Sequence, residues 1–129
     1  MAAAKKPKPQ RGVKTRAGGT LTEAQFWQRI RNKGRQLWLH WPVRTHVLNN
    51  NRIVVTPKRG RRHKFEYQCA HCEFYFPNKE VEVDHIIPAG SISADAHAWF
   101  ERLLCEADNL QVLCKPCHRI KTAEDRKKQ

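Results

Sequence analysis

Two Cys-x-x-Cys pairs constrain this chain of 129 residues more than any other feature of its sequence. One pair is Cys69 with Cys72, and the other is Cys114 with Cys117. Each pair can turn two thiolates toward one ion, and Zn²⁺ favours four thiolate ligands in closed structural sites that stabilise the folded chain directly. Two disulfides or a redox-active pair are the alternatives. The sequence therefore predicts a fold organised around a structural zinc ion held by these four cysteines.

The amino-terminal sequence favours the metal over disulfides. The first ten residues, MAAAKKPKPQ, are basic but contain no apolar stretch of the kind that a secretory signal requires. We therefore expect a reducing, cytoplasmic compartment in which thiols rarely pair. The longest apolar runs, near residues 37–39 and 86–89, are too short for a transmembrane helix, so the chain is not expected to span a membrane. The fifth cysteine, Cys105, is expected to be a small buried apolar side chain.

Charge is distributed very unevenly along the chain. With 25 Lys and Arg against 12 Asp and Glu, the formal net charge is +13. Residues 1–64 hold 17 of the basic residues and Glu23 as their one acidic residue, whereas residues 65–129 hold 8 basic and 11 acidic residues. The first half is expected to bind a polyanion, either nucleic acid or an anionic membrane surface. Contacts with phosphates would weaken as the salt concentration rises. The second half must do something that requires carboxylates.

The first half is predicted to contain an arm, a helix and a linker. Residues 1–20, with six basic side chains, two prolines and three glycines, are expected to form a disordered basic arm, with a targeting signal as the alternative. Thr22 and Gln25 form a capping-box pattern, and apolar residues then recur at helical spacing until Pro42. This apolar stripe is expected to pack against the second half rather than to stack on bases. Residues 21–64 are thus predicted to be an N-terminal helix and a basic linker.

The linker is predicted to contact the nucleic-acid backbone through segment 56–64, TPKRGRRHK. Its basic side chains surround a single glycine, and a solvated charged loop is the alternative. The residues expected to contact phosphates are Lys58, Arg59, Arg61, Arg62 and Lys64.

The segment between the two cysteine pairs is 41 residues long, more than the 15–20 or so of a simple zinc ribbon. Apolar alternation, turn residues and a favourably placed proline predict that this segment and the residues after it form a strand, a helix, a second strand and a second helix. These elements are expected at about residues 81–85, 94–104, 110–114 and 116–127. Both strands and the last helix should therefore meet at the second cysteine pair.

Polar side chains converge where these elements meet. Cys117 and His118 are adjacent on the last helix and point about 100° apart, so Cys117 can face the zinc while His118 faces Asp84 and His85. A carboxylate and an imidazole suit a divalent cation with open coordination positions, which can bind a phosphodiester. A second imidazole can remove a proton from water. A hydrogen-bonded strand end is the alternative for Asp84 and His85, and a turn residue is the alternative for Asn109.

The order of these residues resembles the HNH endonucleases, especially the small phage-type members with cysteine knuckles. The resemblance covers residues 65–125 and is carried by the strings VDHIIP and DNLQVLCKPCHRIKT. It implies an α+β fold with a ββα-metal (His-Me finger) core, so that residues 65–129 would be an HNH nuclease domain. It also implies hydrolysis of double-stranded DNA and a phage or mobile-element setting in a bacterial cytoplasm, where a phage protein could be a second partner.

The resemblance further implies a role for each residue that matches the family's motif. His85 would be the general base that activates water, and Asn109 would hold the loop and orient that base. Asp84 and His118 would hold the catalytic cation. Some members carry another histidine four residues after the last one, where this chain has Thr122. This departure favours Mg²⁺ or Mn²⁺ over tightly held catalytic Zn²⁺.

The leading prediction is therefore a metal-dependent DNA endonuclease whose products carry a 5′ phosphate and a 3′ hydroxyl. Lys121, on the last helix, is expected to neutralise a phosphate, with a solvated helix charge as the alternative. A non-catalytic zinc-dependent nucleic-acid-binding module is the main rival function. An RNA-directed protein is a second rival, because a basic arm suits both nucleic acids.

Overall fold

The structure is a computed structural model that describes residues 12–56, 60, 62–92 and 95–128. The described residues combine helices with small sheets of antiparallel strands, so the fold is of the predicted α+β class. The chain divides into two compact units, residues 1–35 and 36–129, and the boundary falls within helix α1 (Glu23–Leu39). No helix in the described part of the chain is long and apolar enough to cross a membrane.

The first unit contains a small hairpin over the described part of the segment 1–20, which was expected to be a disordered arm; residues 1–11 of that segment lie outside the described residues. Strand β1 (Lys14–Arg16) pairs antiparallel with strand β2 (Leu21–Thr22). The connecting turn is formed through Gly18 and Gly19, whose φ angles of 66° and 81° cost glycine little. The predicted capping box is confirmed, because the Thr22 amide donates to Gln25 Oε1 at 2.9 Å and the Gln25 amide donates to Thr22 Oγ1 at 3.1 Å.

The second unit begins with the end of α1 and a second helix. Pro42 does end the first helical run, but it also starts helix α2 (Pro42–Asn50), because proline is well tolerated in the first turn of a helix. Val43 and Val47, one helical turn apart, then pack into the core. Strand β3 (Arg52–Val54) follows directly. Much of the predicted linker is therefore regular structure.

Two small sheets follow. Strand β3 pairs antiparallel with β4 (Phe65–Gln68), which pairs with β5 (Tyr75–Phe76) beside the first cysteine pair. A single-turn helix η1 (Asn78–Glu80) leads to the second sheet. This sheet is a hairpin of β6 (Val81–His85) and β7 (Leu110–Cys114), which confirms both predicted strands.

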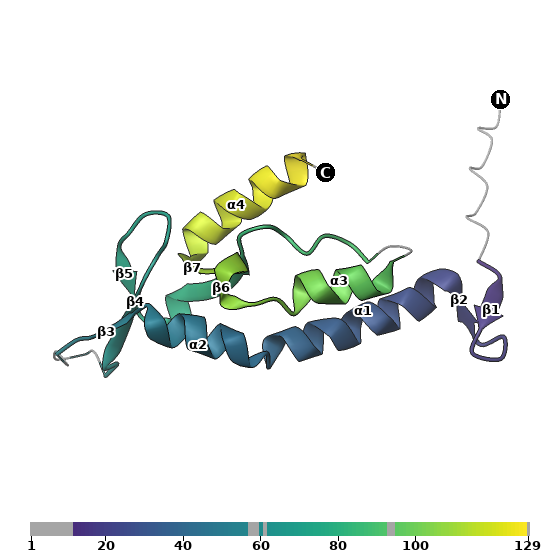
Figure 1. The fold of residues 1–129 in the computed structure, drawn as a ribbon, viewed down its shortest axis with the longest axis horizontal. Helices are drawn as coiled ribbons and strands as arrows, with labels where there is room; N and C mark the ends of the chain where they lie inside the picture. Colours follow the sequence, from purple (N-terminus) through teal and green to yellow (C-terminus); the bar gives the residue numbers. More distant parts are fainter. Residues whose placement is uncertain (1–11, 57–59, 61, 93–94, 129) are drawn as a thin grey trace, which may run out of the picture. The chain divides into compact units, whose positions relative to one another are not determined.

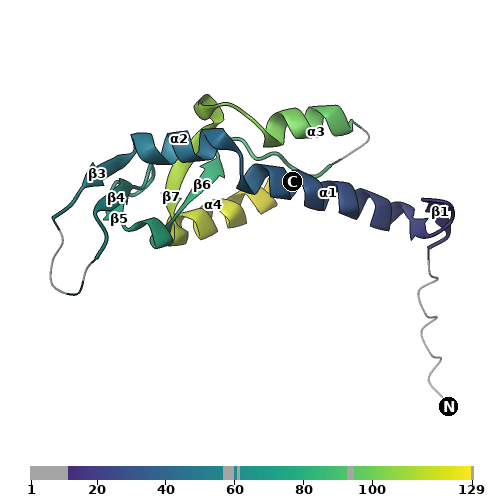
Figure 2. The ribbon, with the colours of Figure 1, turned by 90° about the horizontal axis from the view of Figure 1, so that it is seen from below.

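The two faces of the β6–β7 hairpin differ in character. Cross-strand partners Val83 and Val112 belong to the core cluster on one face, against which α2 packs. Glu82 and Asp84 project from the other face, which is covered by the last helix, α4 (Lys115–Lys127). Figures 1 and 2 show α2 and α4 on opposite sides of the hairpin. The hairpin thus separates an apolar core from a charged layer under α4.

In the sequence, helix α3 (Ala96–Leu103) and the short helix η2 (Ala107–Asn109) lie between strands β6 and β7. Asp95 caps α3 by accepting a hydrogen bond from the Ala98 amide at 3.0 Å. Trp99 is buried, and its indole N–H donates to the Gly90 carbonyl at 3.1 Å. The predicted helices in this half of the chain are therefore confirmed to within two residues over their described parts.

Candidate metal centre

Four cysteines form a cluster that can hold one metal ion. The Sγ atoms of Cys69, Cys72, Cys114 and Cys117 all lie within 4.8 Å of one another. The Cys72 and Cys114 sulfurs are 3.9 Å apart, close to the roughly 3.8 Å edge of a tetrahedron with Zn–S bonds of about 2.3 Å. A disulfide would need about 2 Å, and all five cysteines are free thiols. The donor set therefore fits a structural zinc ion, as predicted from the spacing.

Backbone contacts place these sulfurs. The first pair lies on a tight turn in which the Cys69 amide donates to the Phe74 carbonyl at 2.9 Å and Glu73 takes a positive φ of 66°. The Ala70 amide donates to the Val112 carbonyl at 2.8 Å, which ties this turn to β7. Cys114 ends β7 and Cys117 lies in the first turn of α4, so the second pair spans a strand-to-helix junction.

The thiols of the cluster titrate very differently. Burial raises the pKa of Cys69, but hydrogen bonds from the amides of Cys114, Cys72 and His71 outweigh it and lower the pKa to about 6. The neighbouring Cys114 sulfur and burial raise the pKa of Cys117 to about 12. Without a metal, the cluster therefore keeps part of its protons, and metal uptake must release them.

A second group of charged side chains lies between the hairpin and α4. His118 Nε2 is 3.3 Å from Asp84 Oδ1, and His118 Nδ1 is 2.6 Å from Glu82 Oε2. Glu82 and Asp84 share a face because they are two residues apart on β6. His118 reaches them because it is turned away from Cys117 on α4. The prediction that Asp84 and His118 come together is therefore confirmed.

Lys121 completes this layer. Its ammonium donates to Asp125 Oδ2 at 2.7 Å, to the His85 carbonyl at 2.8 Å, and lies 3.0 Å from Asp84 Oδ2. Burial lowers the pKa of Lys121, but the hydrogen bonds to Asp125 and Asp84 outweigh it and raise the pKa above its usual value. An ammonium has three N–H donors, so each has a protein acceptor here. The predicted phosphate contact of Lys121 would require at least one of these bonds to break.

The geometry of Asp84 and His118 suits two ligands of one cation. Two adjacent ligands of an octahedral ion with bonds of about 2.1 Å lie roughly 3.0 Å apart, close to the 3.3 Å between Asp84 Oδ1 and His118 Nε2. The second carboxylate oxygen of Asp84 is held by Lys121 and, at 3.5 Å, by Gln111. Among the described residues, the cysteines are the one group of three or more ligating side chains. Asp84 and His118 alone would thus leave most coordination positions to water or substrate.

His85 lies on the other face of the hairpin. Its Nε2 is 2.8 Å from the Leu103 carbonyl, and its ring packs against Trp38 with the ring centroids 4.2 Å apart. The physical reason is strand alternation, because successive side chains of β6 project to opposite faces. The prediction that His118 faces both Asp84 and His85 thus holds for Asp84 alone.

Asn109 connects the end of β6 to the start of β7 through hydrogen bonds. Its Oδ1 accepts from the Ile87 amide at 2.9 Å, and its Nδ2 donates to the Ile87 carbonyl at 3.1 Å. The Ile86 amide also donates to the Asn109 carbonyl at 2.8 Å. These bonds fix the segment that leaves β6 against the start of β7.

The structure describes two of the basic residues in segment 56–64 that are predicted to contact nucleic acid. Arg62 and Lys64 are exposed. Lys58, Arg59 and Arg61 lie outside the described residues.

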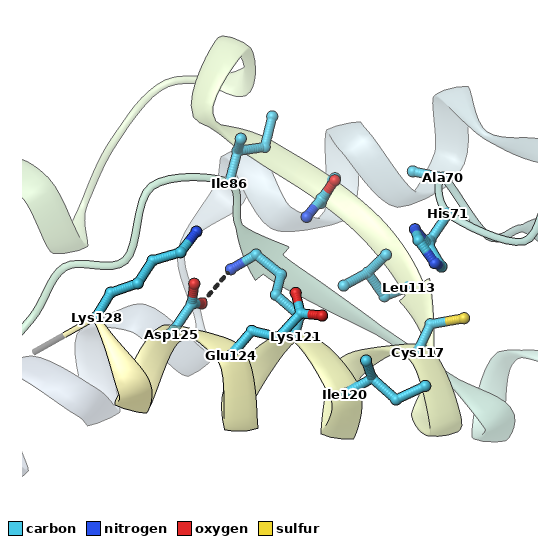
Figure 3. A pocket seen from close by; sticks show the side chains of 11 residues that line it. Ala70, His71, Ile86, Leu113, Cys117, Ile120, Lys121, Glu124, Asp125 and Lys128 are labelled. Carbon is cyan, nitrogen blue, oxygen red and sulfur yellow. Dashed lines mark hydrogen bonds and ion pairs between the residues drawn. The ribbon is translucent and has the colours of Figure 1, made fainter.

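A pocket of ≈ 320 Å³ adjoins the charged layer, between α4, β7 and the turn of the first cysteine pair (Figure 3). Lys121 and Gln111 belong to both, and the pocket wall includes Ile86 and Ile120. The sequence interpretation missed Glu82 and Gln111 as members of this region. The strand period could have identified Glu82, and the register with Asp84 places Gln111 on the same face.

Comparisons of this chain with protein-family models, with curated proteins and with solved structures found no match. The chain is an α+β protein in which four cysteines are positioned to hold a metal ion.

Proposed function

We propose that the chain is a metal-dependent endonuclease of the HNH type that hydrolyses phosphodiester bonds in DNA. The observation that carries the proposal is the 3.3 Å approach of Asp84 Oδ1 to His118 Nε2. Each ligand's other polar atom is already bound by the protein, so these two atoms remain to bind a cation together. The order of β6, β7 and α4 is also that expected of a ββα-metal core.

Mg²⁺ or Mn²⁺ is the proposed cation. A hard cation of this kind prefers oxygen ligands, keeps several waters and is commonly bound through one or two carboxylates together with phosphates. When bound, it supplies Lewis acidity toward a phosphate oxygen. Asp84 and His118 would hold it and leave room for the scissile phosphate.

His85 is the proposed general base. A carbonyl oxygen can only accept a hydrogen bond, so a neutral His85 must donate from Nε2 to Leu103 and carry its lone pair on Nδ1. Nδ1 is therefore the atom that would take the proton from the attacking water. Asn109 holds the residues after His85 and would keep this base in place.

The zinc ion is proposed to be structural, and its position links it to the catalytic ligands. Cys117 and His118 are neighbours in the first turns of α4. Fixing Cys117 and Cys114 on one ion would fix the start of α4 against β7, and with it the distance between His118 and Asp84.

A non-catalytic nucleic-acid-binding module is the second candidate function. The observation that favours it is the placement of His85, whose ring is engaged by Trp38 and Leu103 on the face away from Asp84. In that case the charged layer under α4 would be an ion-pair network that stabilises the helix.

Supercoiled plasmid separates the two functions. The zinc-loaded chain would be incubated with plasmid in Mg²⁺, in Mn²⁺ and in EDTA, and binding to a labelled duplex would be measured in parallel by fluorescence anisotropy. Cutting in either metal but not in EDTA supports the nuclease. Binding without cutting in any metal supports the module, and the absence of both contradicts both functions.

A further inference from the structure

The imidazole of His118 lies between two carboxylates that it contacts with different nitrogens. Nδ1 is 2.6 Å from Glu82 Oε2, the length of a short charge-assisted hydrogen bond. Nε2 is 3.3 Å from Asp84 Oδ1, longer than a good hydrogen bond. The protein therefore holds one nitrogen firmly and leaves the other less engaged.

The position of Glu82 follows from the geometry of strand β6. Glu82 and Asp84 are alternate residues of β6, so they project from the same face of the hairpin toward α4. The side chain of Glu82 is 43% exposed and that of His118 is 31% exposed. Because Glu82 is partly in water, removing its carboxylate should leave the core intact.

The chemistry of imidazole gives this contact a consequence. A neutral imidazole carries one hydrogen, and only the nitrogen without that hydrogen can bind a metal. An ionised carboxylate accepts hydrogen bonds but cannot donate them. Glu82 therefore keeps the hydrogen on Nδ1 and leaves the lone pair on Nε2, the nitrogen that faces Asp84. Carboxylates that accept a hydrogen bond from the second ring nitrogen of a metal-binding histidine act in this way in many metal sites.

We propose that Glu82 is a positioning residue that sets the tautomer and ring orientation of His118 so that Nε2 is presented to a divalent cation shared with Asp84. The inference rests on the cation site of the proposed function. It adds a residue that neither binds the cation nor contacts the substrate.

The test measures Mn²⁺ affinity of the zinc-loaded full chain without nucleic acid, from the electron paramagnetic resonance signal of free Mn²⁺. The variants are Glu82→Ala, Glu82→Gln and His118→Ala. Glu80→Ala is the matched control, because it removes an exposed carboxylate two residues away, in η1. Long-range ¹H–¹⁵N spectra of His118 report its tautomer in each variant.

We expect Glu82→Ala to weaken Mn²⁺ binding about 10–100-fold and to lose the Nδ1–H tautomer. Glu82→Gln should stay close to wild type, because the amide oxygen still accepts from Nδ1, and Glu80→Ala should do so as well. If Glu82→Gln is as weak as Glu82→Ala, the effect is one of charge and the positioning role is wrong.

Two further outcomes separate this inference from the proposed function. If His118→Ala weakens Mn²⁺ binding while Glu82→Ala matches Glu80→Ala, the positioning role is overturned and the cation site stands. If wild type and His118→Ala bind Mn²⁺ equally, the cation site is wrong and the role of Glu82 is wrong with it.

Discussion

The imidazole of His85 packs against the indole of Trp38, with the ring centroids 4.2 Å apart and the ring planes inclined by 33°. The guanidinium carbon of Arg44 lies 4.8 Å from the centroid of the Trp38 ring. The ring of His85 is also fixed by its hydrogen bond to Leu103. The side chain proposed as the base thus contacts Trp38, near the end of α1, and Leu103, at the end of α3.

Replacing His85 by alanine should abolish cleavage while DNA affinity stays near that of wild type. A lost general base typically costs 10²–10⁴-fold in rate, which plasmid cleavage would detect readily. The lost hydrogen bond to Leu103 should lower the free energy of unfolding by about 1 kcal/mol. His97→Ala is the control, since the side chain of His97 is 86% exposed on α3. Cleavage by His85→Ala at the wild-type rate would exclude His85 as the base.

Replacing Cys114 by serine should remove the zinc ion and unfold the second unit. Structural zinc contributes roughly 10–16 kcal/mol of apparent binding free energy, as much as the whole stability of a typical domain. Zinc content by mass spectrometry and thermal unfolding would be measured beside Cys105→Ser, whose thiol lies outside the cluster. The structural role of the metal would be refuted if Cys114→Ser kept both its zinc and its melting temperature.

Acid should loosen the first unit through Glu23. Hydrogen bonds from Arg16 and Trp27 lower the pKa of Glu23 from 4.5 to about 2. Since the folded pKa is the lower one, the stabilisation is fully present above about pH 4.5 and is lost as the pH falls toward 2. Carbon NMR of the Glu23 carboxyl would follow this titration, and Arg16→Gln should move its midpoint back toward 4.5. An unchanged midpoint would show that Arg16 does not hold this carboxylate.

Neutralising Arg59, Arg61 and Arg62 should weaken binding to DNA and reduce its dependence on salt. Each lost phosphate contact should lower the slope of log affinity against log salt by about 0.9. Anisotropy titrations at several salt concentrations would measure the slope. A slope equal to that of wild type would mean that this segment does not contact phosphates.

Local patterns predicted the cysteine cluster and the β6–β7 hairpin well. The Cys-x-x-Cys spacing fixes which sulfurs can meet, and the period of two in residues 81–85 marks a strand with one buried face. The rotation of about 100° between the adjacent helix residues Cys117 and His118 likewise predicted the approach of His118 to Asp84. These features depend on residues that are close in sequence or on strong geometric rules.

The remaining features depended on tertiary contacts. Val43 and Val47 make α2 part of the core, but two valines one helical turn apart are too short a pattern to predict a helix. The packing of His85 against Trp38 joins residues far apart in sequence, and no local pattern encodes that contact. The internal pairing of Lys121 with Asp125 could have been anticipated, since the two residues are four apart on one helix.

The most direct test compares plasmid cleavage in Mg²⁺ by wild type, Asp84→Asn and Asp108→Asn. Asparagine keeps the shape of Asp84 but removes the charge that would bind the cation, whereas Asp108 is an exposed residue of η2 outside the charged layer. We expect wild type and Asp108→Asn to cut equally and to stop in EDTA. Asp84→Asn should lose more than the roughly 10–100-fold that follows loss of an outer-shell partner. Equal cutting by all three proteins would contradict a catalytic cation at Asp84 and His118.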